Sequence, residues 1–313
     1  MDFNILILGS GAATPARGRH CSSQLVTLCG KRLLIDCGES TQGQLRKYHQ
    51  RLQAIKTILI SHLHGDHFFG LPGLLSTMHL CGRTEPLTVY APKGAKDALL
   101  LLFDVSGTHL DYELTINEMD FDQPTLILQE RAFHVTAFPL RHSVPTFGFI
   151  IAEEPPLLNL RPGMRECYDM TNDQCVSVKN GADLTLADGT VVPCAELTYP
   201  RRQARRYAYC CDTAYDESLV PLLQGVDLLC MESTFASDFA DLAEQRCHCT
   251  AAQAATIALH AEAGQLLLTH FSKRYRDIEP IEAEATALFP NTICASDGLL
   301  YQIPYKNEEP TRH

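Results

Sequence analysis

Four side chains that can bind metal ions follow a short apolar run within six residues. Residues 55–61 (IKTILIS) have the composition of a strand, and the chain continues with His62, His64, Asp66 and His67. Imidazole and carboxylate groups are suitable ligands for zinc, and Gly65 permits close backbone approach within the turn. At these spacings the side chains cannot all face one way on a strand, whereas on a loop or helix start they can converge. The segment therefore predicts a metal site at a strand end.

So many ligands in one short segment suit two metal ions better than one. Two ions about 3.5–4 Å apart could share the cluster and take further ligands from elsewhere in the chain. Three other strand-like runs are each followed by a candidate, namely His142 after 133–140, Asp212 after 207–211 and His270 after the run LLLT. A site at one edge of a sheet requires this arrangement.

The remaining sequence alternates strand and helix signals. Strands are expected at 3–9, 22–37 (a hairpin around Cys29-Gly30), 55–61, 87–91, 125–152 (consecutive antiparallel strands), 207–211, 226–231 and 265–270, and helices at 40–52, 71–81, 93–105, 216–224, 250–263 and 279–288. Residues 153–206 contain several turn signals and are interpreted as an inserted, protruding segment within one domain of residues 1–313. The pattern predicts an α/β fold whose mixed sheet has helices on both faces.

Charge and composition restrict the possible partners and compartment. The net charge of −11 taken alone argues against nucleic acid, although arginines and lysines cluster near 17–19, 201–206 and 273–276. No run reaches the roughly 18 apolar residues of a membrane span. The apolar N-terminus lacks a basic segment before it and is interpreted as a first strand, so a cytoplasmic protein is expected. The 13 cysteines are interpreted as reduced, mostly buried thiols.

Several motifs resemble the metallo-β-lactamase superfamily and, within it, the short bacterial form of the ribonuclease Z family. The resemblance covers nearly the whole chain. It rests on Ile7–Gly11 (ILGSG), Leu34–Glu39 (LIDCGE) with Thr41-Gln42, Ser61–Gly70 (SHLHGDHFFG), Asp212-Thr213, and Thr269–Ser272 (THFS) with Arg274-Tyr275. The last block is specific to ribonuclease Z within the superfamily.

This resemblance implies a fold, an activity and a set of ligands. The fold would be an αβ/βα sandwich of two mixed β-sheets flanked by helices, with a protruding arm. One zinc ion would bind His62, His64 and His142, and the other Asp66, His67 and His270, with Asp212 bridging and Asp66 also acting as general base. The activity would be removal of 3′ trailers from tRNA precursors, leaving a 3′-hydroxyl. A homodimer that binds precursor tRNA is also implied, and ligand type permits Mn²⁺ or another divalent ion in place of zinc.

Three further motifs match the family imperfectly. Its His-Glu-Ala-Thr reads Met231–Thr234 (MEST) here, and its His-Ser-Thr reads His248–Thr250 (HCT). Glu232 and His248 are retained, and such a pair could protonate a leaving oxygen. Residues 15–20 (PARGRH) resemble a loop that contacts the tRNA 3′ region, which makes Arg17 and Arg19 candidate substrate-binding residues. Arg274 is a third candidate, for phosphate.

Two other classes of function remain open from the residues alone. The same metal site would serve a small-molecule phosphodiesterase or another metallo-hydrolase, acting on a small diester, a lactone or a thioester. A non-catalytic RNA-binding or metal-binding module is the other class, and the complete ligand set with a spare acid and base disfavours it.

Overall fold

The computed structural model describes residues 2–16, 18–199 and 203–305, which divide into two compact units. The larger unit comprises Met1–Ala152 and Arg206–Ile303. The smaller unit comprises Glu153–Arg205 and Pro304–His313. All the candidate metal ligands belong to the larger unit.

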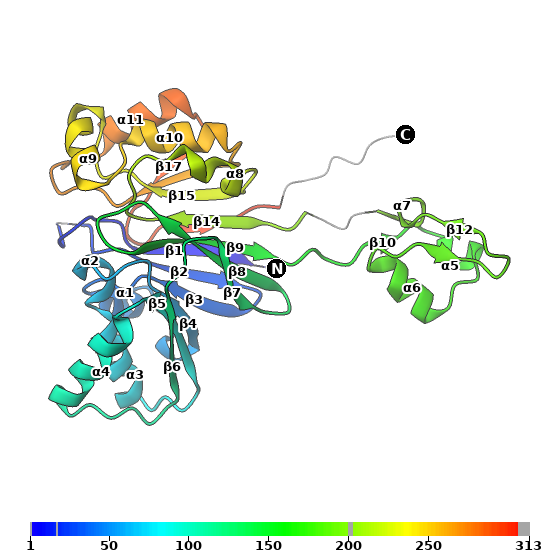
Figure 1. Cartoon of the computed structure of the whole chain (residues 1–313), viewed down its shortest axis with the longest axis horizontal. Coiled ribbons are helices and arrows are strands. Elements are labelled where there is room, and N and C mark those ends of the chain that lie inside the picture. The colour runs from blue at the N-terminus through cyan, green and yellow to red at the C-terminus, as the bar shows by residue number, and fades with distance from the viewer. Residues whose placement is uncertain (1, 17, 200–202, 306–313) are drawn as a thin grey trace. The chain divides into compact units, whose positions relative to one another are not determined.

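Two seven-stranded mixed sheets form the larger unit (Figure 1). In spatial order the first contains β18 (Leu300–Gln302), β1 (Phe3–Gly9), β2 (Ser23–Leu28), β3 (Lys31–Ile35), β4 (Ile55–Leu59), β5 (Leu87–Pro92) and β6 (Leu114–Met119). The second contains β17 (Thr292–Cys294), β16 (Leu266–Thr269), β15 (Leu228–Glu232), β14 (Arg206–Cys210), β9 (Thr146–Glu153), β8 (Phe133–Leu140) and β7 (Thr125–Gln129). Strands β3 to β6 are mutually parallel, as are β14 to β17.

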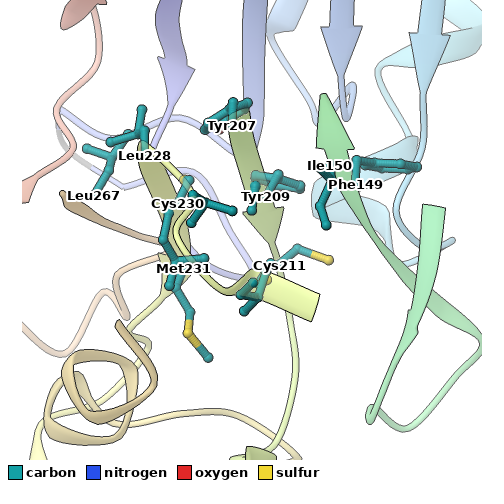
Figure 2. Close-up of a cluster of buried hydrophobic side chains, with 14 of the residues drawn as sticks. Phe149, Ile150, Tyr207, Tyr209, Cys211, Leu228, Cys230, Met231 and Leu267 are labelled. Carbon is teal, nitrogen blue, oxygen red and sulfur yellow. The ribbon is translucent and has the colours of Figure 1, made fainter. Parts of the chain in front are cut away.

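The alternation of side chains along β1 shows why the first sheet is buried on both faces. Ile5 and Ile7 belong to the core that also contains the side chains of the second sheet, whereas Leu6 and Leu8 belong to a separate core under the first group of helices. Successive residues of a strand point to opposite faces, so one apolar run serves both layers. Figure 2 shows the second-sheet side of the shared core, including Phe149, Tyr209 and Leu267.

Helices cover the outer faces of both sheets (Figure 1). Those following the first sheet's strands are α1 (Thr41–Lys47), α2 (Gly65–Phe68), α3 (Leu71–Leu80) and α4 (Ala95–Ser106), with the 3₁₀ turn η1 (Leu52–Ala54). Those on the other side are α8 (Val220–Leu223), α9 (Ala240–Arg246), α10 (Ala251–His260) and α11 (Glu279–Leu288), with η2 (Glu217–Leu219) and η3 (Ser237–Phe239). The expected α/β sandwich of two mixed sheets flanked by helices is thus confirmed.

Several elements differ from the sequence-based expectation. The helix expected at 40–52 ends at Lys47, because His49 adopts a left-handed backbone with φ 56°. Ser40 is also left-handed, and its side chain makes no capping hydrogen bond. The helix expected at 216–224 is a 3₁₀ turn followed by a single helical turn. Strands β6, β17 and β18 were not expected.

The smaller unit has short elements and its own apolar cluster. Its elements are β10 (Asn159–Leu160), α5 (Met164–Cys167), α6 (Asn172–Lys179), β11 (Leu184–Thr185), β12 (Val191–Val192), α7 (Cys194–Leu197) and β13 (Thr198–Tyr199). Met170, Val178 and Leu197 are among the residues buried in it. Across the residues described in both units, no helix has the length and apolarity to cross a membrane.

Candidate metal centre

The seven candidate ligands converge at one edge of the two sheets. His62 and His64 follow β4, and Asp66 and His67 lie in the short helix α2. His142 follows β8, Asp212 follows β14 and His270 follows β16. Close packing of the surrounding backbone positions the α2 segment, since a Cβ atom on Gly38 would lie 2.2 Å from the Asp66 carbonyl oxygen and one on Gly70 2.1 Å from that of Gly38. These two glycines, rather than Gly65, permit the close backbone approach around the α2 segment.

One donor group contains three histidines and an oxygen of Asp212. His64 Nδ1 lies 3.1 Å from His62 Nε2 and 3.4 Å from His142 Nε2. Asp212 Oδ2 lies 3.6 Å from His62 Nε2 and 3.8 Å from His142 Nε2. All four donor atoms therefore surround one small space.

A second donor group uses the other oxygen of Asp212. His67 Nε2 and His270 Nε2 are 3.2 Å apart, and Asp66 Oδ2 lies 3.6 and 3.4 Å from them. Asp212 Oδ1 lies 3.3 Å from His67 Nε2 and 3.2 Å from His270 Nε2. Asp212 thus presents one oxygen to each group.

These donor spacings match the requirements of tetrahedral metal sites. Four ligand atoms about 2.05 Å from a zinc ion are separated from one another by about 3.3 Å. Asp212 Oδ1 is moreover buried without a hydrogen-bond partner among the described residues, which is unusual for a carboxylate oxygen. Imidazole and carboxylate donors at this spacing, with an unsatisfied oxygen between the two groups, fit a pair of divalent ions.

Hydrogen bonds behind the ligands fix which ring nitrogen faces each donor group. His67 Nδ1 lies 2.7 Å from Asp36 Oδ2, and the carbonyl oxygen of Cys247 accepts from His142 Nδ1 at 2.9 Å. A carboxylate or carbonyl only accepts, so each Nδ1 carries the proton and each Nε2 presents its lone pair to the site. Asp36 is fully buried and also accepts hydrogen bonds from Ser61 and Tyr209.

The Thr234 hydroxyl fixes the ring of His270 in the same way, by a hydrogen bond to Nδ1, and also bonds to Glu232. The Thr234 hydroxyl donates to Glu232 Oε2 at 2.6 Å, so it is free to accept from His270 Nδ1 at 2.9 Å. The other carboxylate oxygen of Glu232 accepts from His248 Nδ1 at 2.8 Å and from the Thr213 amide at 2.8 Å. One buried carboxylate therefore holds both the candidate acid His248 and, through Thr234, a candidate metal ligand.

The electrostatics of the site favour ionised carboxylates and a charged His248. Burial opposes ionisation of Asp66 and Asp212, but the neighbouring imidazoles of His67 and His270 hold both pKa values below the ordinary range. Burial likewise opposes the charged form of His248, but the Glu232 carboxylate prevails and raises its pKa to about 9.

Three of the nine described non-glycine residues with a left-handed backbone lie at the metal centre. Asp36, Cys247 and His270 adopt left-handed conformations with φ of 56°, 55° and 62°. Such conformations are disfavoured for residues other than glycine by roughly 1–3 kcal/mol each, and they cluster at functional sites in proteins generally.

The three candidate substrate-binding residues, unlike the metal ligands, do not all converge on one place. Arg274 lines an open cavity of about 950 Å³ over the metal ligands, and its guanidinium lies 5.5 Å from the centre of the Phe239 ring. Arg19 is not among the residues that line this cavity, and its guanidinium donates to the Tyr275 carbonyl oxygen. Arg17 lies outside the described residues.

Asp36, Thr234 and Ser61 lie in motifs recognised in the sequence, but their contacts with the ligands were not predicted. Arg246, which also lines the cavity, was not singled out, and Lys273, which lines it too, was noted only as part of the basic cluster at 273–276. A carboxylate directly after an apolar strand was the available signal for Asp36, the same signal that pointed to Asp212.

The fold and site define a hydrolase of the metallo-β-lactamase class. The metallo-β-lactamase fold protein YhfI from Bacillus subtilis has a similar structure, with a TM-score of 0.69 at 20% identity over 96% of this chain and 100% of that one. The human short-form tRNase Z has a TM-score of 0.71 at 29% identity over 96% and 99%. Residues 3–148 also match the family model described as anti-Pycsar protein Apyc1.

Sequence comparison with known proteins is more specific. The ribonuclease Z of Parabacteroides distasonis is 40% identical over 298 residues, which cover 95% of this chain and 98% of that protein. The ribonuclease Z of Bacteroides thetaiotaomicron is 41% identical over 301 residues, covering 96% and 95%. This chain belongs to the ribonuclease Z family.

Proposed function

We propose that this chain is an endoribonuclease that removes 3′ trailers from tRNA precursors and leaves a 3′-hydroxyl on the tRNA. The supporting observation is the end-to-end similarity to ribonucleases Z, combined with a candidate proton donor beside two adjacent metal-donor groups. The cofactors proposed are two Zn²⁺ ions, with Mn²⁺ as the alternative. The first donor group would hold one ion and the second the other, with Asp212 shared between them.

When bound, such ions make water acidic enough to ionise near neutral pH and offset charge on phosphate oxygens. Asp66 would orient the attacking water and accept its proton. Its low pKa makes it a weak base, so its main contribution is orientation. His248, charged at neutral pH and fixed by Glu232, would protonate the departing 3′ oxygen. The phosphate then remains on the trailer.

The proposed activity is tested by mapping the cut in a 3′-extended tRNA with and without a chelator. Cleavage at the trailer junction that disappears with chelator and returns with zinc is expected. The variant His248→Ala should lose about 10²–10⁴-fold in turnover, the range for general acid catalysis. Near-normal turnover by that variant would remove His248 from the mechanism.

The alternative proposal is a small-molecule phosphodiesterase on the same fold. Its support is the metal-donor set itself, which a metallo-hydrolase of this fold could use on a small diester as well as on RNA. Comparing kcat/KM for a structured tRNA precursor and for a small diester separates the two, and a clear preference for the small diester would support this alternative.

Assembly and location are also proposed rather than established. A homodimer is supported by apolar side chains exposed on α4, where Leu101 and Val105 are 63% and 71% accessible. Light scattering of the wild type and of Leu101→Asp tests it, and a wild-type monomer at working concentrations would contradict it. A cytoplasmic location follows from the substrate class, and fractionation of cells would check it.

The smaller unit is proposed as the arm that contacts tRNA. Its support is the exposed Arg161 and Arg165, although the Arg165 side chain also donates to Asn172 at 2.9 Å. If these side chains contact phosphate, changing both to glutamine should weaken tRNA binding. Unchanged affinity of that double variant would argue against an electrostatic role for the arm.

A further inference from the structure

The helix α9 ends in a turn whose backbone is fixed by two hydrogen bonds. The Cys247 amide donates to the Glu244 carbonyl oxygen at 3.1 Å, and the His248 amide donates to that of Ala243 at 2.8 Å. This is the pattern of a Schellman motif, in which the left-handed position is normally glycine. Here that position is Cys247, with φ 55°. The turn therefore keeps a disfavoured residue in a defined conformation at the edge of the metal centre.

This turn presents two functional groups at successive positions. The Cys247 carbonyl oxygen holds the ring of His142, and His248 is the candidate proton donor. Arg246 is the residue immediately before them and the last residue of α9. Its side chain thus starts two residues from the proposed acid, on a backbone that cannot shift without disturbing a candidate metal ligand.

Arg246 is available to a ligand, unlike arginines whose guanidinium groups are bound within the fold. It is exposed, it lines the cavity of about 950 Å³, and its guanidinium has no hydrogen bond or ion pair with any residue that the structure describes. By contrast, Arg19 and Arg83 donate to backbone carbonyl oxygens of the fold. Since the chain carries a net charge of −11, binding of a polyanion depends on local cations of this kind.

The cavity lining has the charge that an RNA strand requires. Besides the charged His248, its cations are Arg246, Lys273 and Arg274, and its only carboxylates among the described lining residues are Asp66 and Asp212, both in the metal-donor groups. Arg246 lies on the wall that contains His248, whereas Lys273 and Arg274 follow His270. Guanidinium groups bind phosphate oxygens in a planar, two-point geometry.

We propose that Arg246 binds the backbone phosphate on the 5′ side of the last tRNA nucleotide, the nucleotide whose 3′ oxygen departs. This inference rests on the proposed function, because it uses the role of His248. If His248 faces the departing 3′ oxygen, that nucleotide lies against the cavity wall formed by the end of α9 and His248, and the phosphate on its 5′ side lies farther along the tRNA strand. Arg246 is the arginine or lysine on this wall among the residues described.

The first test measures binding without turnover. A fluorescent RNA with a tRNA acceptor stem and a 3′-hydroxyl end is titrated with the zinc-loaded protein over a series of salt concentrations. Arg246→Gln should weaken binding about tenfold, as expected for loss of a hydrogen bond to a charged group. It should also lower the slope of log affinity against log salt by about 0.7, the value for one single-strand phosphate contact. Arg246→Lys should keep most of the slope.

The matched control is Arg131→Gln, which removes the same charge from the exposed turn between β7 and β8, outside the cavity lining. Its affinity should stay within about twofold of the wild type. Equal metal content and unchanged melting temperature show that each variant is folded. An equal effect of Arg131→Gln and Arg246→Gln would reduce the result to a general charge effect and overturn the proposal.

A second test identifies the phosphate. Replacing the phosphate 5′ of the last nucleotide by a neutral methylphosphonate should weaken wild-type binding by the same factor as Arg246→Gln and should have little further effect in that variant. If the variant remains as sensitive to the neutral linkage as the wild type, Arg246 does not bind this phosphate. Cleavage of precursor tRNA is scored separately, so loss of the proposed function and loss of this contact give different results.

Discussion

Replacement of Thr234 by valine isolates the contribution of one hydroxyl to the metal centre. Valine has nearly the same shape as threonine, and position 234 is 4% exposed, so the packing is kept while the hydroxyl is lost. The change leaves His270 Nδ1 without its acceptor at 2.9 Å and Glu232 Oε2 without its donor at 2.6 Å. The ring of His270 is then free to rotate, and its Nε2 lone pair is no longer fixed toward the second donor group.

Two independent estimates give the size of this effect. Removing a residue that orients a metal ligand lowers metal affinity by roughly 10–100-fold, which equals about 1.4–2.7 kcal/mol. A hydrogen bond to a charged group contributes about 1.5–3 kcal/mol. The agreement predicts that the zinc dissociation constant of the second donor group rises by one to two orders of magnitude, while that of the first donor group changes little.

Competition with a chromophoric chelator measures both dissociation constants. Thr234→Ser retains the hydroxyl and should stay within about threefold of the wild type, which separates the hydrogen bonds from the packing of the methyl group. Thr146→Val is the control for removing a buried hydroxyl, because among the described residues the Thr146 hydroxyl donates to the Val144 carbonyl oxygen alone. Two unchanged zinc affinities in Thr234→Val would refute the role assigned to this hydroxyl.

Three other perturbations have defined outcomes. Glu232→Gln removes the carboxylate that raises the pKa of His248 to about 9. Because activity falls as His248 loses its proton, the activity of the metal-saturated variant should begin to fall at lower pH than that of the wild type. Identical pH–rate profiles of the two proteins would contradict this. Glu153→Gln removes the charge of the carboxylate that lies 2.7 Å from the buried Arg205 guanidinium, at a cost of about 3–5 kcal/mol. Limited proteolysis should then cut within residues 153–205 faster than in the wild type, and an unchanged rate of cutting there would count against this prediction. Chelation of the metal should lower the melting temperature measured by calorimetry, and an unchanged value would mean that the donor groups hold no ion.

The ligands were predictable because each follows an apolar strand, whereas the residues that hydrogen-bond to the ligands were not. Asp212 and His270 stand directly after runs of mostly apolar residues, and His142 follows such a run after Arg141, a pattern that the sequence itself displays. The contacts of Thr234 and of the Cys247 carbonyl depend on backbone torsions that L-residues rarely adopt. Nothing in the sequence indicates that Cys247 would be left-handed, since glycine is the usual residue there.

The missed strands have a related explanation. Strand β6 (LTINEM) is largely exposed, and its apolar–polar alternation covers only residues 114–117 before two consecutive polar residues, which is a short signal. Strands β17 and β18 have three residues each, too few for any periodicity. Arg19 was grouped with substrate-binding residues by its motif, yet its guanidinium donates to the Tyr275 carbonyl oxygen in the fold itself.

The distribution of donors between the two sheets has a consequence for folding. His62, His64, Asp66 and His67 come from the first sheet, and His142, Asp212 and His270 come from the second. An ion shared between them is a cross-link between layers, in a chain whose 13 cysteines are all free thiols. Each ion would stabilise the docked sheets by about 4 kcal/mol at a thousandfold excess over its Kd. The metal supply would thus determine how long the two sheets stay docked as well as how fast the enzyme cleaves RNA.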